Sequence, residues 1–277
     1  MAMNRKLTYS REPKNLDLIS ENKTVQEVSD LSSTTPRETS SVLQGYEKTD
    51  GILSYNIVCV ISGGERKEKD FLRELIRQKD LHSLRVAFIS KKGQGLQPYQ
   101  MQEIWLNIQQ TGMITFPNQQ YRLDSMDKVF LLSDVDEFYD QLVKIVGEHR
   151  DTDLGQWIIS NPCFEIWLYY CFLDDPTSDL ASIKPLSEAK RSKEMKRLGN
   201  DCIKGGLNPL LAFENMRIGI NHSTAHYSED EQSIPILFAT QMHEMAQYLI
   251  DTMNQNINEY NEFIKKKREW RNMMKKD

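Results

Sequence analysis

Two carboxylates separated by one residue follow an apolar run near the middle of the chain. The run over residues 128–133 (KVFLLS) ends in Asp134-Val135-Asp136-Glu137. If this run is a β-strand, side chains two residues apart share a face, so Asp134 and Asp136 would point the same way. Paired carboxylates suit a hard cation such as Mg²⁺, which supports phosphodiester chemistry. The alternative is that Asp134 caps the next helix while Asp136 and Glu137 complement its dipole.

A glycine-containing loop, SGGERKE over residues 62–68, follows another apolar run. Glycine permits a tight turn and a close backbone approach, and the amides that open a helix favour anions. The loop therefore suits a phosphate or a metal-linked nucleotide. It matches neither GxxxxGKS/T nor GxGxxG, so it gives little support to an ATP-binding or dinucleotide-binding site. A plain glycine turn before an exposed helix explains it equally well.

Asn161, Pro162 and Glu165 follow a further apolar run over residues 155–160. Asn161 as a helix cap and Pro162 as the first helical residue would account for these two residues structurally. Glu165 is the one charge in an apolar stretch that reaches Phe172. Because a charge in such surroundings needs a partner or a cation, we count Glu165 among the candidate functional residues.

Basic residues that could contact phosphates lie in two segments. Lys91 and Lys92 follow the second apolar run, and residues 265–276 hold seven basic residues against one acidic, Lys266 and Arg268 among them. Such cations could track nucleic-acid phosphates, and the amide of Asn161 is a further candidate contact. A solvated helix end whose cations complement the helix dipole is the alternative for the tail. The net charge of −5 does not indicate a generic nucleic-acid binder.

Apolar runs alternate with amphipathic stretches between residues 55 and 173. This alternation predicts βαβ units, a parallel sheet flanked by helices and the α/β class. In such sheets ligands bind beyond the carboxyl ends of the strands, where all the candidate acids lie. Strands are expected over residues 55–61, 84–89, 128–133 and 155–160, and helices over residues 68–76, 98–110, 138–147 and 163–172.

Three regions are expected along the chain. Residues 1–52 are rich in Ser, Thr, Glu, Lys and Asn and predict a disordered leader. Residues 53–173 form the α/β domain, and residues 174–277 form a helical C-terminal region whose long basic final helix begins near Ser233. No apolar run approaches the roughly 20 residues that cross a bilayer, and the first residues lack a signal-peptide core. We therefore expect a cytoplasmic protein without a membrane partner.

Three of these segments together resemble the RloB family, small proteins with a Toprim-like fold from prokaryotic antiphage and restriction-associated loci. They are IVCVISGGERKEKDF over residues 57–71, Asp134-Val135-Asp136-Glu137, and SNPCFEIW over residues 160–167. The last is similar to the family's NPxFExW signature. The resemblance covers residues 55–173, is looser in the C-terminal region, and implies a Toprim-like parallel sheet with a helical C-terminal extension.

The resemblance also implies roles for individual residues. Toprim-like domains hold Mg²⁺ with a glutamate after the first strand and a DxD after a later one, which makes Asp134 and Asp136 metal ligands. Glu68 matches the second glutamate of the family's EGxxTE loop and is a third ligand. The sequence departs from the family at Gly63, where the first glutamate would stand, and at Cys171, where many relatives have histidine. The residues that could supply the missing oxygen are Glu65 and Glu165.

The leading hypothesis is a Toprim-type nuclease that depends on Mg²⁺ or Mn²⁺ and acts on DNA or RNA in antiviral defence. Asp134 and Asp136 would hold the metal, Glu65 or Glu68 would position or activate water, and the family suggests a partner ATPase. The second hypothesis, favoured by Gly63, is a catalytically degenerate subunit that binds a nucleic acid or nucleotide without cutting it. The third is an interaction module whose Met- and aromatic-rich final helix forms a coiled coil or a homodimer seam.

Overall fold

The computed structural model describes residues 56–77, 84–93, 95–116, 119–148 and 154–273. The expected leader over residues 1–52 lies outside the described residues. A four-stranded parallel sheet, in the order β2-β1-β5-β6, forms the centre of the fold. This confirms the expected α/β class, with a parallel sheet flanked by helices. The strands are β1 (Asn56–Ser62), β2 (Leu84–Ile89), β5 (Lys128–Asp134) and β6 (Gly155–Ser160).

The strand order reverses between β1 and β5. The chain passes from β1 outward to β2 and then returns to β5 on the other side of β1. At such a switch point the connections on the two sides leave in opposite directions, and a crevice opens at the carboxyl ends of the two strands. The loop after β1 and the acidic segment after β5 therefore begin side by side.

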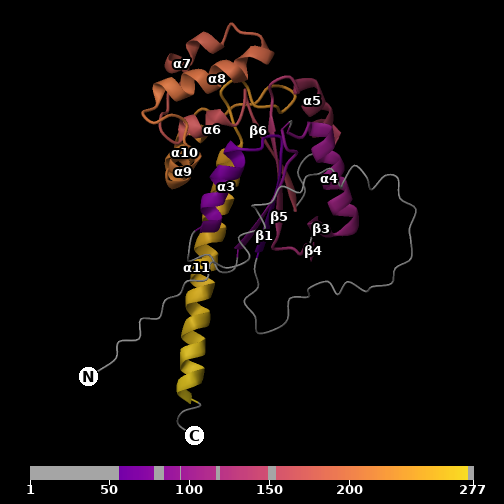
Figure 1. The fold of residues 1–277 in the computed structure, drawn as a ribbon, viewed down its shortest axis with the longest axis vertical. Helices are drawn as coiled ribbons and strands as arrows, with labels where there is room; N and C mark the ends of the chain where they lie inside the picture. Colours follow the sequence, from indigo (N-terminus) through magenta and orange to yellow (C-terminus); the bar gives the residue numbers. More distant parts are fainter. Residues whose placement is uncertain (1–55, 78–83, 94, 117–118, 149–153, 274–277) are drawn as a thin grey trace.

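Strand β1 is buried on both faces, as its continuous apolar run predicts. Cys59 and Ile61 belong to a core cluster with Trp105 and Leu142. Their neighbours Val58 and Val60 belong to a second cluster on the other face. The helices of the first face are α4 (Pro98–Thr111) and α5 (Tyr139–Glu148), and the second face carries α3 (Lys67–Arg77), α6 (Glu165–Tyr170) and α11 (Met242–Met273), as Figure 1 shows.

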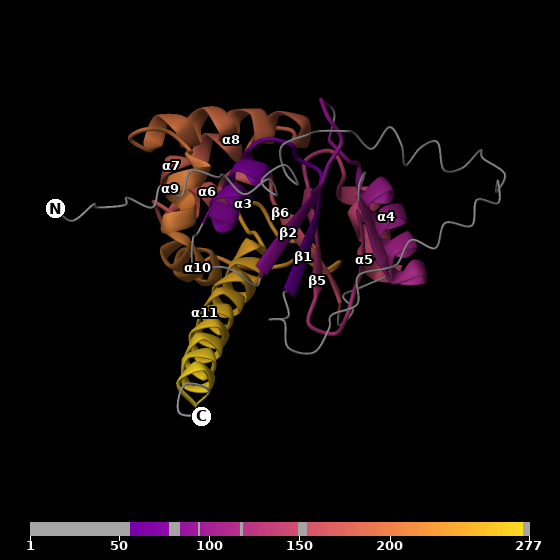
Figure 2. The same ribbon diagram turned by 60° about the horizontal axis from the view of Figure 1, so that its bottom comes forward.

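The C-terminal helices pack on the α3 face of the sheet. Met195, Phe213 and Met216 lie in the same core cluster as Val58 and Phe71. The core therefore continues from the sheet into the C-terminal region, and Figure 2 shows these helices gathered beside α3 and α6. They are α7 (Pro176–Asp179), the 3-10 helix η3 (Ala181–Ile183), α8 (Glu188–Cys202), α9 (Pro209–Glu214) and α10 (Met216–Ala225).

The final helix begins at Met242, so the expectation that it begins near Ser233 is wrong. Residues 236–241 instead run along the edge strand β6, where Phe238 N–H donates to Asn161 O and Gln241 N–H donates to Ile159 O, each at 2.9 Å. Phe238 has a φ of 74°, which a helix does not accommodate. The edge of the sheet needs hydrogen-bond partners, and this need overrides the helical spacing of the apolar residues.

A short antiparallel hairpin, β3 (Met113–Phe116) and β4 (Gln119–Arg122), was not expected from the sequence. Its strands have four residues each, which is too short for alternation to stand out. Ile114 and Tyr121 anchor the hairpin in the α4 and α5 core.

Helix α11 runs from the carboxyl end of β6 down the sheet and projects beyond the body (Figures 1 and 2). At 1.5 Å per residue, Lys266 and Arg268 lie about 36 Å or more along the axis from its first residue.

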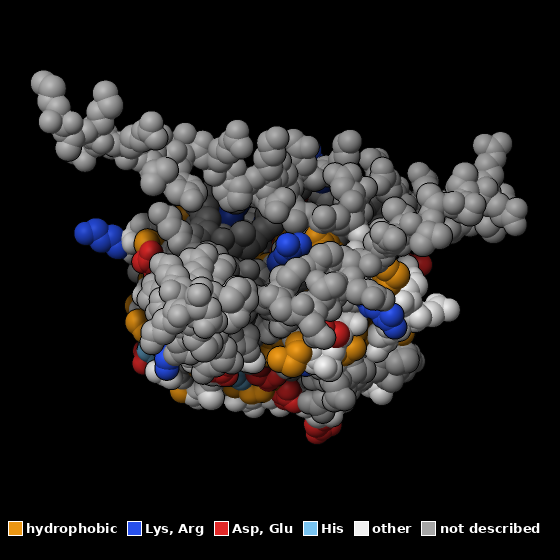
Figure 3. All heavy atoms as spheres, turned by 90° about the horizontal axis from the view of Figure 1, so that it is seen from below, with side chains coloured by type: hydrophobic (Ala, Val, Ile, Leu, Met, Phe, Trp, Pro, Cys, Tyr) orange, Lys and Arg blue, Asp and Glu red, His pale blue; other side chains and the backbone are white. Residues whose placement is uncertain are grey.

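None of the described helices is long and apolar enough to cross a lipid bilayer. In the view from below, the coloured Lys and Arg side chains are spread among hydrophobic and acidic ones (Figure 3).

Candidate active site

The backbone of the loop after β1 is held against β5. Gly63 N–H donates to Leu132 O at 2.9 Å, which continues the pairing of the two strands by one residue. At Gly64, an added Cβ would lie 1.8 Å from Glu68 Oε1. A larger residue here would displace the Glu68 carboxyl group, because the Glu68 side chain folds back across this position. The loop thereby directs Glu68 from the first turn of α3 toward the strand ends.

Three buried or nearly buried carboxylates from different elements meet at this point. Glu68 comes from α3, Asp134 ends β5, and Glu165 begins α6. The exposed fractions of residues Glu68 and Glu165 are 8% and 6%. Asp134 Oδ1 accepts a hydrogen bond of 2.8 Å from Phe164 N–H, which ties the end of β5 to the start of α6. We call Glu68, Asp134 and Glu165 the acidic cluster.

Burial and mutual repulsion raise the pKa values of two members of the acidic cluster. Burial raises the pKa of Glu68 to about 7, and the charge of Glu165 adds to the shift. The pKa of Asp134 lies well above its usual range, first because of burial and then because of the charges of Glu68 and Glu165. More negative charge is gathered here than the surroundings stabilise, so the cluster favours a proton or a cation.

Two lysines lie against the acidic cluster. Lys67 Nζ is 3.4 Å and Lys196 Nζ is 3.9 Å from Glu165 Oε1. Burial lowers the pKa of Lys196, but the charge of Glu165 and neighbouring groups outweighs burial and raises it overall. Glu165 therefore has the partner that its apolar surroundings require. The sequence offered no signal for Lys196, which is one of many charges on α8.

Asp134 and Asp136 lie in different environments. β5 ends at Asp134, and Asp136 has a φ of 30°, so strand alternation does not extend to it. Asp136 N–H donates to Pro162 O at 3.2 Å, and its side chain lines a separate pocket. Asp134 does act as a cap, but for α6 and not for the helix that follows it, because Phe164 is the N-cap residue of α6.

Glu65 contacts the loop after β2 and not the residues of the acidic cluster. Its Oε2 accepts a hydrogen bond of 2.9 Å from Gly93 N–H. This bond holds the turn that carries half-buried Lys91 and exposed Lys92 beside the loop after β1. Lys91 and Lys92 thus lie at the carboxyl ends of the strands, next to β1, whose loop leads to Glu68 of the acidic cluster.

The match with known proteins covers both the sheet and much of the C-terminal region. A family model described as RloB-like protein matches residues 57–249, which is more than half of the chain. The chain belongs to the RloB-like protein family. Neither the curated proteins nor the solved structures gave a match.

The two departures from the RloB-like pattern have a structural setting. A Cβ on Gly63 would lie 3.2 Å from Leu96 O and 3.4 Å from Leu132 O, and one on Gly95 would lie 1.9 Å from Gly63 O. The loop before α4 is packed on Gly63, so a glutamate there would have to move this loop. Cys171 is buried, and a Cβ on Gly219 of α10 would lie 2.7 Å from its Sγ. A histidine at 171 would have to displace α10.

Asn161 and Pro162 do not open a helix, contrary to the structural explanation offered for them. The helix α6 of this RloB-like chain begins at Glu165, and the Asn161–Pro162 peptide bond is cis. Asn161 Nδ2 donates to Pro235 O at 2.8 Å, so this amide holds the segment beside β6. The pattern of an asparagine cap followed by proline does not distinguish these two arrangements.

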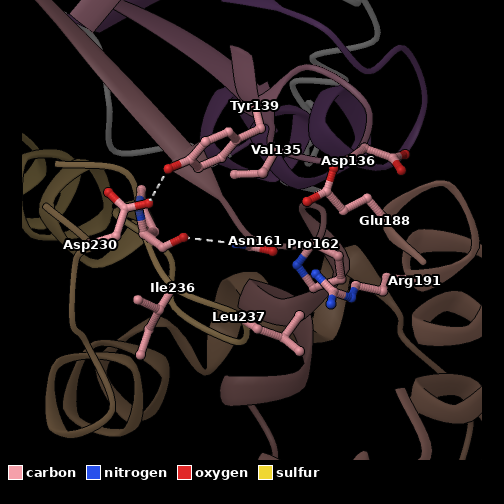
Figure 4. Close-up of a pocket in the computed structure, with 11 residues that line it drawn as sticks. Val135, Asp136, Tyr139, Asn161, Pro162, Glu188, Arg191, Asp230, Ile236 and Leu237 are labelled. Atoms are coloured by element: carbon pink, nitrogen blue, oxygen red, sulfur yellow. Dashed lines mark hydrogen bonds between the residues drawn. The ribbon is translucent and has the colours of Figure 1, made fainter. Parts of the chain in front are cut away.

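A pocket of about 220 Å³ is lined by Asp136, which is two residues after Asp134 of the acidic cluster, and Figure 4 shows the residues that line it. One wall is apolar and the rim is polar, with Tyr139 Oη donating to Asp230 Oδ2 at 2.6 Å. Burial opposes ionisation of Asp230, but hydrogen bonds from Tyr139 and from backbone amides lower its pKa overall. The apolar wall consists of Val135, Pro162, Pro235, Ile236 and Leu237, and the rim of Asp136, Tyr139, Asn161, Glu188, Arg191 and Asp230.

The acidic cluster fits a cation in its chemistry. In the part of the chain that the structure describes, no three His, Cys, Asp or Glu side chains surround one point as metal ligands. Mg²⁺ does not require such a cage, because it is commonly held by one or two carboxylates together with waters and phosphate oxygens. Glu68 and Asp134, whose pKa values are both raised, provide that smaller set.

Lys266 and Arg268 lie in the last turns of α11. The helix begins beside the carboxyl end of β6 and runs along the strands toward their amino ends. The basic tail and the acidic cluster are thus at different ends of the molecule, and one short stretch of nucleic acid would not touch both.

Proposed function

We propose that the chain is a nuclease that hydrolyses phosphodiester bonds in DNA or RNA with the help of Mg²⁺ or Mn²⁺. The observation that carries the proposal is the meeting of three carboxylates, Glu68, Asp134 and Glu165, at the switch point of the sheet, where burial and mutual repulsion raise the pKa values of the first two. Structural acids normally have partners that lower the pKa of a carboxyl group, whereas the pKa values of Glu68 and Asp134 stay raised although Lys67 and Lys196 lie beside Glu165. Such an accumulation of carboxylates is typical of a site that binds a cation or moves a proton.

Glu68 and Asp134 would hold the cation, and Glu165 would complete the negative surroundings. When bound, a divalent cation would polarise a phosphoryl oxygen and lower the pKa of a bound water. Because the pKa of Glu68 is about 7, its carboxyl group gives up or takes a proton near neutral pH. Cation binding should therefore release a proton and strengthen as the pH rises toward 7.

Lys67 and Lys196 would contact the phosphate that is cleaved. Their ammonium groups lie 3.4 Å and 3.9 Å from Glu165 Oε1, which holds them at the edge of the acidic cluster. A phosphate oxygen next to the cation would be within the electrostatic reach of both. Lys91 and Lys92, on the loop that Glu65 holds, would contact a neighbouring phosphate.

The proposal is tested by hydrolysis of end-labelled single- and double-stranded DNA and RNA with Mg²⁺ or Mn²⁺. We expect cleavage by the wild type, loss of cleavage in Asp134→Asn, and wild-type cleavage in Glu137→Gln. Glu137 is a matched control because it is exposed and belongs to the same acidic tetrapeptide. Cleavage that persists in Asp134→Asn would contradict the assignment.

We extend the proposal to a role in prokaryotic antiviral defence together with a partner ATPase. Its support is membership of the RloB-like family. Co-expression with a candidate partner ATPase during phage infection tests this role: we expect protection by the wild type and none by Asp134→Asn.

The second candidate is a subunit that binds a nucleic acid or nucleotide without cutting it. Two observations favour it: Gly63 stands at the position of the family glutamate, and Lys67 and Lys196 already balance part of the acidic cluster. In that case a nucleic acid would bind equally well in Mg²⁺ and in EDTA and would remain intact.

A further inference from the structure

The pocket beside the acidic cluster is suited to one planar group. Its volume of about 220 Å³ is below the roughly 300–1,000 Å³ of pockets that enclose drug-sized ligands. The apolar wall includes two proline rings, Pro162 and Pro235. Arg191 faces this wall, and its guanidinium lies beside Pro162 in Figure 4. Its Nε donates to Leu186 O at 3.0 Å, which fixes the orientation of the guanidinium plane.

The rim of the pocket is rich in hydrogen-bond acceptors. Asp136, Glu188 and Asp230 contribute carboxylates against the one cation of Arg191. Asp230 is held ionised by hydrogen bonds that include the one from Tyr139. A free phosphate would be repelled by three carboxylates, whereas amino and ring N–H groups would be attracted.

The pocket lies close to the proposed reaction site. Asp136 lines the pocket, and Asp134 is two residues earlier, so their Cα atoms are at most about 7 Å apart. Pro162 lies between the two sites, where its carbonyl oxygen accepts from Asp136 N–H. Helix α8 contributes to both sites, with Arg191 in the pocket and Lys196 at the acidic cluster.

We infer that this pocket binds a single unstacked nucleobase bearing an amino group, from a single-stranded segment of the substrate. The base would stack between the Arg191 guanidinium and the proline wall, as unpaired bases stack on arginine planes in RNA recognition. The carboxylates of the rim would accept from its amino group. The inference rests on the proposed function, and it names the substrate as single-stranded at the site of cleavage.

The test is fluorescence anisotropy with short labelled single-stranded RNAs made only of adenine, cytosine or uracil, in EDTA so that nothing is cleaved. Adenine and cytosine carry an amino group that uracil lacks, so we expect the wild type to bind one of them more tightly than oligo-uridine. Arg191→Ala should weaken that binding roughly tenfold, the effect of losing one stacking partner. Ile236→Trp, which fills the pocket from an exposed position, should do the same without a change in charge.

Arg197→Ala is the matched control. It removes the same charge from the same helix, at an exposed site where Arg197 pairs with Glu194 and Asp201. Equal binding of the three RNAs by the wild type, no binding of any of them, or equal weakening in Arg191→Ala and Arg197→Ala would overturn the inference. The assay contains no metal and measures binding alone, so its result does not depend on cleavage. The absence of cleavage and the absence of base-dependent binding are therefore separate results.

Discussion

Glu68 makes the stability of the protein depend on pH in a direction opposite to that of most carboxylates. Burial, with the charge of Glu165, raises its pKa from 4.5 to about 7, so between these values the folded chain binds more protons than the unfolded one. The contribution of Glu68 to the free energy of unfolding is fully present below about pH 4.5 and is lost as the pH rises through 7. The pKa difference corresponds to about 3 kcal/mol as an upper value.

We therefore expect the melting temperature to fall between pH 5 and about 7.5, and to fall less in Glu68→Gln than in the wild type. Asp134 has a raised pKa of the same sign, so part of the slope should remain in the variant. Thermal denaturation across this range measures the difference, with Glu137→Gln as the control that keeps the wild-type slope. Parallel curves for wild type and Glu68→Gln would contradict the assigned pKa.

Lys196 should affect cation binding and catalysis in opposite directions. Its ammonium group lies beside the acidic cluster and competes with a cation, so Lys196→Ala should bind Mn²⁺ several-fold more tightly. The same change should slow hydrolysis, because a phosphate contact is lost. Calorimetry and the cleavage assay measure the two effects, with exposed Lys193 on the same helix as the control. Weaker Mn²⁺ binding in Lys196→Ala would mean that the lysine only supports the fold of the site.

At the scale of elements, Gly63 fixes how closely the loop before α4 approaches β1. Gly63→Ala places a Cβ 3.2 Å from Leu96 O, which is backbone and yields only if the loop moves. We expect a loss of roughly 1–3 kcal/mol in the free energy of unfolding. Gly147→Ala, at an open and exposed position of α5, should instead stabilise the chain by up to about 1 kcal/mol. Urea denaturation compares the two, and a neutral Gly63→Ala would show that the loop adapts freely.

The elements that could be predicted are those whose pattern depends on local burial. β2 and β6 match their expected bounds, β5 differs by one residue at its carboxyl end, and β1 is shifted by one residue at both ends, because strands buried on both faces are continuous apolar runs. Residues 236–241 could not be predicted, since their non-helical course depends on the hydrogen-bonding edge of β6. The site was predictable in part. Asp134 follows from a strand end and Glu165 from a charge in an apolar stretch, and Glu68 is implied by the resemblance to the RloB family, whereas Lys196 is brought in by the packing of α8.

For the whole molecule, α11 divides into a core part and a projecting part. Met242, Met245 and Leu249 are buried against the sheet, so they are not available as a homodimer seam. Truncation after residue 255 would keep these residues and remove seven basic and four acidic ones. We expect an unchanged melting temperature and a smaller dependence of nucleic-acid affinity on salt, because fewer counterions are released.

Binding titrations at several salt concentrations measure this effect, and light scattering on the same samples measures the mass. An unchanged salt slope would show that Lys266 and Arg268 do not contact the nucleic acid. A mass that halves would show that the later turns of α11 hold two copies together.

Mn²⁺ binding, measured by calorimetry near pH 7.5, tests the central claim most directly. We expect binding by the wild type, its loss in Glu68→Gln and in Asp134→Asn, and its retention in Asp136→Asn and Glu137→Gln, because Asp136 lines the pocket and Glu137 is exposed. No binding by a wild-type protein whose fold is confirmed by circular dichroism would contradict the account. Loss of binding in Asp136→Asn with retention in Glu68→Gln would also contradict it, because the metal would then lie outside the acidic cluster.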